Sequence, residues 1–314
     1  FFFKQKTAYE IRNCDWSSDV CSSDLSILSG PAGGMVAAIK TATIAGFDKI
    51  IGFDMGGTST DICHHNGEVN PGDYERTFDT EVAGVRLRIP MMAIHTIAAG
   101  GGSILRFDGS RYRVGPQSAG AYPGPLAYRQ GGPLTLTDAN LMVGKLQPAF
   151  FPALFGAQGN QPLDGAAVRQ AFQNLGAEIA SLTGDQPQPE QVAAGFLAIA
   201  VETMASAIKK VSIQRGYDLG DYTLCSFGGA AGQHACLLAE SLGMARVFLH
   251  PLAGVLSAYG MGLADQRVMR EQTLAIPLTA TAMASLHQAL DRLDRKSTRL
   301  NSSHSSVSRM PSSA

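Results

Sequence analysis

Two aspartates that flank a pair of glycines and a run of hydroxyl side chains form the string with the clearest chemical potential. Asp54 and Asp61 bound this string, and the residues between them that could act are Gly56, Gly57, Thr58, Ser59 and Thr60. Because glycine has no Cβ, backbone N–H groups at a Gly-Gly turn can approach phosphate oxygens closely. Asp54 could hold Mg²⁺ through water, since Mg²⁺ takes few carboxylates, while Asp61 orients a nucleophile. The string therefore predicts a phosphate and Mg²⁺ site, and the alternative is a plain hairpin with two solvated aspartates.

A second string of small residues follows a strand-like run and precedes a helix-like one. Its candidate nucleotide-binding residues are Gly228, Gly229, Ala230 and Gly232. Small residues that lead into a helix N-terminus make a donor-rich surface of positive potential, which can take a phosphate or pack against an adenosine. Glycine loops before helices are common in proteins. This string is therefore informative only together with the first one.

Histidines supply the remaining candidates. His95 precedes the glycines at residues 100–102 and could contact a substrate or transition state, although a structural histidine is the alternative. His234 could touch a nucleotide or cap a helix. Cys63, His64 and His65 are adjacent, but a strand would place His64 on the face opposite the other two, and two ligands do not make a metal site.

Alternating strand-like and helix-like segments predict an α/β architecture to position these residues. Strands are expected at residues 49–54, 60–64, 222–227 and 246–250, and helices at 165–175, 189–216 and 233–242. Hairpins are expected within residues 71–140, one of them turning at Asp108 and Gly109 between 104–107 and 112–114. Asp54 then lies where the first strand ends, and the second glycine string follows another strand, which is typical of a nucleotide site.

Composition narrows the class of protein. The 314 residues are 45% hydrophobic and 16% charged, with a formal net charge of −1. This balance supports a sizeable core and argues against nucleic-acid binding, and the low charge favours a part of a larger assembly. No membrane span is expected, because the best candidate, residues 247–264, contains Pro251 and three glycines. Outside residues 1–25 the three cysteines form no CxxC pair, which favours a cytoplasmic location.

Both ends differ from the interior. Residues 1–25 contain the sole Trp and two cysteines without periodicity, and residues 296–314 are rich in serine. Both segments resemble translated sequencing-adapter read-through, a contaminant of assembled metagenomic genes, and a native disordered extension is the alternative. We therefore expect non-native segments at 1–25 and 296–314.

The two glycine strings together resemble known ATPases. Residues 54–61 are similar to the second phosphate motif, and 227–232 to the adenosine motif, of the actin, sugar-kinase and chaperone ATPase superfamily. Strings at 29–34, 51–61, 94–103, 114–120, 131–140 and 227–234 resemble the hydantoinase A/oxoprolinase family. The resemblance implies an actin-like, ribonuclease-H-like ATPase fold, a mixed sheet flanked by helices with a Gly-rich β-hairpin insertion, incomplete in this chain. It also implies a partial hydantoinase A/oxoprolinase ATPase domain at 26–295.

Within that family, the strings at 150–152, 161–164 and 256–260 are most similar to the branch that uses ATP to open the lactam of 5-oxo-L-proline to L-glutamate. The resemblance implies that Asp54 holds Mg²⁺, that Asp61 and His95 assist catalysis, and that both glycine strings bind ATP. It also implies a small cyclic amide substrate, with a B-type domain or subunit that completes hydrolysis. For the full-length protein we expect a homo-oligomer.

The family carries a further Asp-x-Gly-Gly-Thr phosphate loop upstream of its Ser-Gly-Pro-Ala-Gly-Gly string. This sequence has no such loop before Ser29, so we expect no ATP turnover by this chain alone. An N-methylhydantoinase or a ketone carboxylase subunit, with the same ATP chemistry, is one alternative. A non-catalytic actin-like nucleotide-binding module is another.

Overall fold

The computed structural model describes residues 29–67, 76–77, 80–82, 85–87, 91–264 and 282–292. The chain divides into two units, residues 1–264 and 265–314, and the described part of the second unit is a helix at 282–292. The segments 1–25 and 296–314, for which non-native origins are expected, lie outside the described residues. All elements below belong to the first unit.

A five-stranded mixed sheet forms the centre of the first unit, in the order β11-β10-β1-β2-β7. β1 pairs in parallel with β10, and β10 with β11, whereas β2 runs antiparallel to both β1 and β7. The strands are β1 (Ile50–Met55), β2 (Thr60–His65), β7 (Ile94–Ile97), β10 (Thr223–Phe227) and β11 (Arg246–Phe248). The four strands predicted at residues 49–54, 60–64, 222–227 and 246–250 are thus confirmed within one or two residues at each end.

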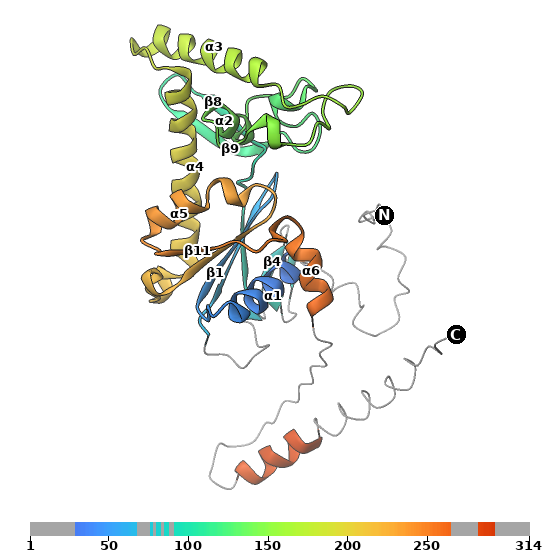
Figure 1. Cartoon of the computed structure of the whole chain (residues 1–314). Coiled ribbons are helices and arrows are strands. Elements are labelled where there is room, and N and C mark those ends of the chain that lie inside the picture. The colour runs from blue at the N-terminus through green and yellow to red at the C-terminus, as the bar shows by residue number, and fades with distance from the viewer. Residues whose placement is uncertain are drawn as a thin grey trace, which may run out of the picture. The chain divides into compact units, whose positions relative to one another are not determined.

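Helices cover both faces of this sheet (Figure 1). α1 (Ser29–Ile44) and α6 (Leu256–Leu263) lie on one face, where Ile50 of β1 joins their apolar cluster. α4 (Pro189–Val211) and α5 (Ala235–Leu242) pack on the other face, against Ile51 and Phe53. Alternate β1 side chains therefore enter opposite cores, as the two-residue period of a strand requires. This arrangement confirms the expected mixed sheet flanked by helices.

α4 is the core helix expected at residues 189–216. It starts at Pro189, and its buried positions include Phe196, Met204 and Ile208. It is long and apolar enough to cross a membrane, but 56% of its apolar window is buried inside the protein. The segment at residues 247–264 is divided among β11, a 3₁₀ turn (η8, Ala253–Val255) and α6, so it is not one continuous helix.

A second layer contains a hairpin and two further helices. β8 (Ser103–Phe107) pairs with β9 (Tyr112–Ser118) across the predicted Asp108-Gly109 turn. α3 (Gly165–Thr183) begins where predicted, because the Asp164 side chain accepts a hydrogen bond from the Ala167 N–H at 3.0 Å, but it continues eight residues beyond the predicted end at 175. α2 (Leu136–Met142) lies between the hairpin and α3 in the chain.

Short elements complete the described chain. The strands are β3 (Arg76–Thr77), β4 (Thr80–Val82), β5 (Val85–Leu87) and β6 (Met91–Met92). The 3₁₀ turns are η3 (Leu126–Tyr128), η4 (Pro148–Phe150), η5 (Ile213–Arg215), η6 (Leu219–Asp221) and η7 (Ala231–Gln233).

One buried carboxylate organises the loop before α2. Asp138 is fully buried and accepts hydrogen bonds from the backbone N–H groups of Leu126, Ala127 and Thr135 at 2.8–3.1 Å. The Thr135 hydroxyl donates a fourth bond at 2.9 Å. The bond from the Thr135 N–H is one half of a capping box at the start of α2, in which the Thr135 side chain accepts in return from the Asp138 N–H. Burial raises the pKa of Asp138, and these hydrogen bonds oppose that rise. The carboxylate therefore ties residues 126–127 to the helix.

Asp138→Asn is expected to lower the free energy of unfolding by about 2 kcal/mol, because the amide nitrogen presents hydrogens to backbone donors that lose their acceptor. Urea unfolding of the full chain measures this change. The exposed Asp185→Asn substitution is the matched control and should stay within about 0.5 kcal/mol of wild type. Equal stability of the two variants would contradict this role for Asp138.

Candidate functional site

Three backbone turns meet at the carboxyl ends of β1 and β10. The first is the turn from β1 to β2, which contains Gly56 and Gly57. The second is the loop at residues 100–102 after β7, whose Gly101 N–H donates to the Gly56 carbonyl at 3.0 Å and whose Gly102 N–H donates to the Gly57 carbonyl at 2.6 Å. In the third, at residues 228–230, the Ala230 N–H donates to the Met55 carbonyl at 2.9 Å. Ligands of α/β sheets bind outside the carboxyl ends of strands, which is where these turns lie.

Two carboxylates stand beside these turns. Asp54 and Asp61 are directly paired residues of β1 and β2, so their side chains leave the sheet on the same face. The Ser257 hydroxyl of α6 donates to Asp54 Oδ2 at 3.2 Å, and the Thr96 hydroxyl of β7 donates to Asp61 Oδ1 at 2.5 Å. The strands expected at 49–54 and 60–64 pair in antiparallel orientation, which brings Asp61 beside Asp54.

The two carboxylates differ in their surroundings. Burial raises the pKa of Asp54 to about 6, the Ser257 hydrogen bond opposes this shift, and the charge of Asp61 adds to it. Among the described residues, no cation contributes to this pKa, and the ionised form of Asp54 is destabilised by a second carboxylate. A bound cation would relieve both effects.

Glycines in these turns are of two kinds. At Gly100 a Cβ would lie within 2.6–2.7 Å of the backbone of the Gly57 turn, and at Gly228, with φ +90°, it would overlap the Asp54 carboxylate. At Gly57 and Gly229, in contrast, a Cβ would meet no atom within 4 Å, and neither residue has a positive φ. Packing and backbone strain explain why glycine occupies positions 100 and 228. They do not explain the glycines at positions 57 and 229. Exposed backbone at Gly57 and Gly229 therefore offers an open surface to a ligand.

The other predicted residues of the phosphate turn differ in burial. Thr58 is exposed and Ser59 is half-buried, and the Ser59 carbonyl accepts a hydrogen bond from the Gly56 N–H at 3.0 Å. Thr60 is fully buried, and its hydroxyl donates to the Ala99 carbonyl at 2.6 Å. Thr60 thus holds the glycine loop after β7 in place. In the adenosine-type string, Gly232 is exposed and Ala230 is buried.

The structure does not bring His95 to the carboxylate pair. In β7, Thr96 pairs with Asp61, whereas His95 pairs with Ile62, so His95 leaves the sheet on the opposite face. Ile62 belongs to the core cluster that contains α4. Burial lowers the pKa of His95, and the charge of Lys210 in α4 lowers it further. This side of the sheet is separate from the site.

His234 also points away from the open surface. It is fully buried, makes no side-chain cap to α5, and lies 3.2 Å from the Asn140 amide of α2. Burial lowers its pKa to about 4, so the ring is neutral near pH 7.

Two residues of the site were not predicted from the sequence. They are Ser257 and Thr96, whose hydroxyl groups donate hydrogen bonds to the two carboxylates. Their segments were singled out only for the family resemblance. Thr96 lies next to His95, and the resemblance already covered its segment. Ser257 is 203 residues from Asp54, and nothing in the local sequence predicts that contact.

The residues present fit Mg²⁺ only if a ligand completes its shell. Among the described residues, no three His, Cys, Asp or Glu side chains gather closely enough to hold a metal ion by themselves. Mg²⁺ is usually bound by one or two carboxylates together with waters and substrate phosphates. Asp54 and Asp61 beside an open backbone turn match that donor set.

Comparison with known proteins agrees with this geometry. The chain is 41% identical over 285 residues to a 5-oxoprolinase of Dictyostelium discoideum, covering 85% of this chain and 22% of the relative. It superposes on an ATP-dependent caprolactamase from Pseudomonas jessenii with TM-score 0.68 and 34% identity, covering 86% of this chain and 38% of that one. Nucleotide-free acetone carboxylase gives TM-score 0.67 and 27% identity, again over 86% of this chain and 38% of that one.

The chain spans about a fifth of the length of the curated 5-oxoprolinases that it matches. Residues 18–270 match the Hydantoinase/oxoprolinase family over most of the chain. This protein therefore belongs to the hydantoinase/oxoprolinase family.

Proposed function

We propose that this chain is the ATP-binding, lactam-activating part of a 5-oxoprolinase-type enzyme, which hydrolyses 5-oxo-L-proline to L-glutamate. The observation that carries the proposal is the convergence of glycine turns beside Asp54 and Asp61. Relatives named 5-oxoprolinase at 41% and 46% identity support the choice of substrate.

The chemistry requires activation because a five-membered lactam is a stabilised amide. Attack of the lactam oxygen on the γ-phosphorus of ATP forms a C–O–P link and releases ADP. Water then adds to the activated carbon, and cleavage of the ring C–N bond leaves an amine and an acyl phosphate. A second water attacks the acyl phosphate, which gives the carboxylate and releases phosphate. In this proposal the B-type part completes the hydrolytic steps.

Each element of the site has a defined task in the proposal. Backbone N–H groups at Gly57 and Gly229 face the phosphates, because both positions border open space. Asp54 holds Mg²⁺, which when bound neutralises phosphate charge. Asp61, fixed by the Thr96 hydroxyl, orients the ligand shell around it. His95 has no task here, since it leaves the sheet on the other face.

A ketone carboxylase subunit is the second candidate, because acetone carboxylase shares this fold and is ATP-dependent. An N-methylhydantoinase is a related candidate with the same ATP chemistry. For the whole protein we further propose a cytoplasmic homo-oligomer that includes a B-type domain or subunit. Screening 5-oxoproline, hydantoins and ketones against the full-length enzyme would separate these substrates.

Asp54→Asn is expected to weaken Mg²⁺-ATP binding at least about tenfold, because the metal loses its carboxylate anchor. Isothermal titration calorimetry on the full chain measures the dissociation constant. Without Mg²⁺ the same variant should bind ATP no more weakly than wild type, since a negative charge near the phosphates is gone. Asp185→Asn is the charge-matched control. Unchanged Mg²⁺-ATP binding by Asp54→Asn would remove Asp54 from the site.

Mg²⁺-ATP affinity is expected to fall as the pH is lowered through about 6, the raised pKa of Asp54. The sign follows from the carboxyl group, which is ionised above this pKa and protonated below it, and only the ionised form attracts the cation. Titrations between pH 5 and pH 8 measure the profile. Asp54→Asn supplies the baseline for titration of the nucleotide itself. A wild-type profile that parallels this baseline would contradict the assignment.

The chain alone is expected to bind Mg²⁺-ATP without hydrolysing it. It carries one Asp-x-Gly-Gly-Thr string, whereas two such strings are expected to hold the phosphates in the family. Malachite-green detection of phosphate in the presence of 5-oxoproline tests this expectation. Phosphate release at ordinary enzyme rates, about 1 s⁻¹ or faster, would show that one loop suffices.

A further inference from the structure

Two arginines face each other on the outer side of the β8–β9 hairpin. Arg106 and Arg113 are directly paired across the antiparallel strands, so their side chains leave the same face with Cβ atoms about 5 Å apart. Leu105 and Val114, the next pair along, lie on the face that packs into the core. Like charges in directly opposed positions destabilise a sheet. Asp108 of the turn offsets the charge of Arg113, so the charge that an added anion would offset is that of Arg106.

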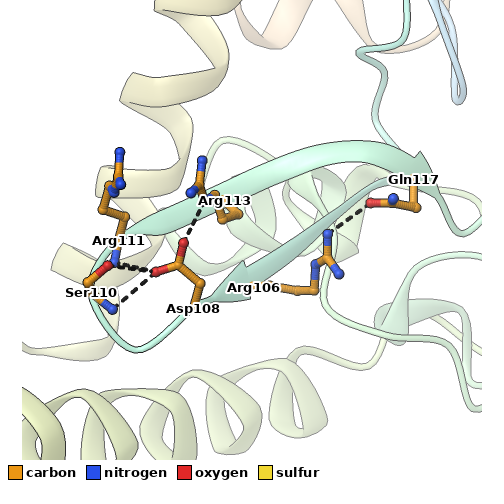
Figure 2. A network of polar contacts seen from close by, with 6 residues as sticks. All are labelled: Arg106, Asp108, Ser110, Arg111, Arg113 and Gln117. Atoms are coloured by element: carbon orange, nitrogen blue, oxygen red, sulfur yellow. Dashed lines mark hydrogen bonds and ion pairs between the residues drawn. The ribbon is translucent and has the colours of Figure 1, made fainter.

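Arg113 is held in place from the turn. Its Nε donates to Asp108 Oδ2 at 2.6 Å, while Asp108 Oδ1 accepts hydrogen bonds from the backbone N–H groups of Ser110 and Arg111 at 3.1 and 2.9 Å (Figure 2). These contacts, above all the Arg113 hydrogen bond, keep the pKa of Asp108 well below its usual range. This hydrogen bond to Asp108 engages Nε and does not use the two terminal amino groups of Arg113.

Arg106 is held from the other end of the hairpin. Its Nη2 donates to Gln117 Oε1 at 2.9 Å, and Figure 2 shows the side chain turned toward Gln117. Gln117 is uncharged, so this contact positions Arg106 without neutralising it. Both guanidinium groups are thus partly ordered before any ligand arrives, which lowers the entropy cost of binding.

A cavity of about 460 Å³ lies at this pair, a volume within the usual range of small-molecule sites. It is lined by Arg106, Phe107, Asp108, Arg113, Gly115 and Pro116. Asp108 is the acidic member of the lining, and its charge is matched by Arg113. With the further charge of Arg106, the lining is net positive, although the whole chain carries a formal net charge of −1.

The two arginines lie away from the nucleotide turns. Arg106 follows Ser103 by three residues, which places it about 10 Å along β8 from the end of the glycine loop at residues 100–102. Gly115, at the other end of the lining, borders Ala98 and Ser103 beside that loop.

We propose that the outer face of the β8–β9 hairpin is a second ligand site, in which Arg106 and Arg113 bind the carboxylate or phosphate group of a small molecule. Guanidinium groups suit both anions because their planar N–H forks match two oxygens at once. The proposal does not depend on the proposed ATP chemistry.

Ligand-observed NMR on the full chain tests the site with two probes in separate arms. Inorganic phosphate is followed by ³¹P line broadening and L-5-oxoproline by saturation transfer, both without nucleotide. We expect at least one probe to bind, and the responding probe tells a phosphate source from a carboxylate source. Arg106→Gln and Arg113→Gln should each raise its dissociation constant about tenfold or more, because each removes charge-assisted hydrogen bonds.

Arg111→Gln is the matched control, since it removes the same charge from the same hairpin but lies outside the cavity lining. It should bind the probe as wild type does. If Arg113→Gln fails to fold, Arg113→Lys keeps the charge but loses the planar fork, and it should still weaken binding. Absence of binding by both probes, or an equal loss in Arg111→Gln, would overturn the proposal. Neither result bears on Mg²⁺-ATP binding at Asp54, which is measured separately.

Discussion

Close contact between backbone turns is the constraint on which the rest of the site depends. The loop at residues 100–102 lies against the Gly57 turn at distances that no Cβ at Gly100 could share, and Gly228 approaches Asp54 equally closely. Any larger residue at these two positions would push the turns apart. The sheet contributes by ending β1 and β10 at the same edge, because they are parallel neighbours. The exposed glycine backbone beside two carboxylates then follows from backbone geometry more than from side chains.

A second close contact supports this site from one face of the sheet. α1 and α6 approach until a Cβ at Gly260 would overlap the Gly33 carbonyl, and this contact brings the Ser257 hydroxyl to Asp54. Substitution of either glycine would therefore act on Asp54 through the position of α6. The raised pKa of Asp54 depends on the same enclosure, since burial is its largest cause. The helices on this face thus set both the position and the charge of the metal-binding candidate.

Sequence reasoning predicted local features well and long-range ones poorly. Asp54 and Asp61 are joined by one short turn, so a strand–turn–strand pattern was enough to place them together. The face of His95 depends on how β7 pairs with β2 across an intervening segment, and a shift of one residue would reverse it. Ser257 reaches the site only through helix packing. α2 was not among the expected helices, because residues 71–140 were expected to form hairpins, although Thr135 followed three residues later by the acidic Asp138 is a local signal of a helix start.

The proposed site requires that three separate turns form one Mg²⁺-nucleotide surface. Hydrogen exchange of backbone amides, read by mass spectrometry with and without Mg²⁺-ATP, measures whether they bind one ligand together. Residues 54–60, 98–103 and 227–233 are expected to gain protection together, while residues 182–188, at the connection from α3 to α4, stay unchanged. Protection confined to one of the three segments, or absent from all of them, would contradict the proposed site.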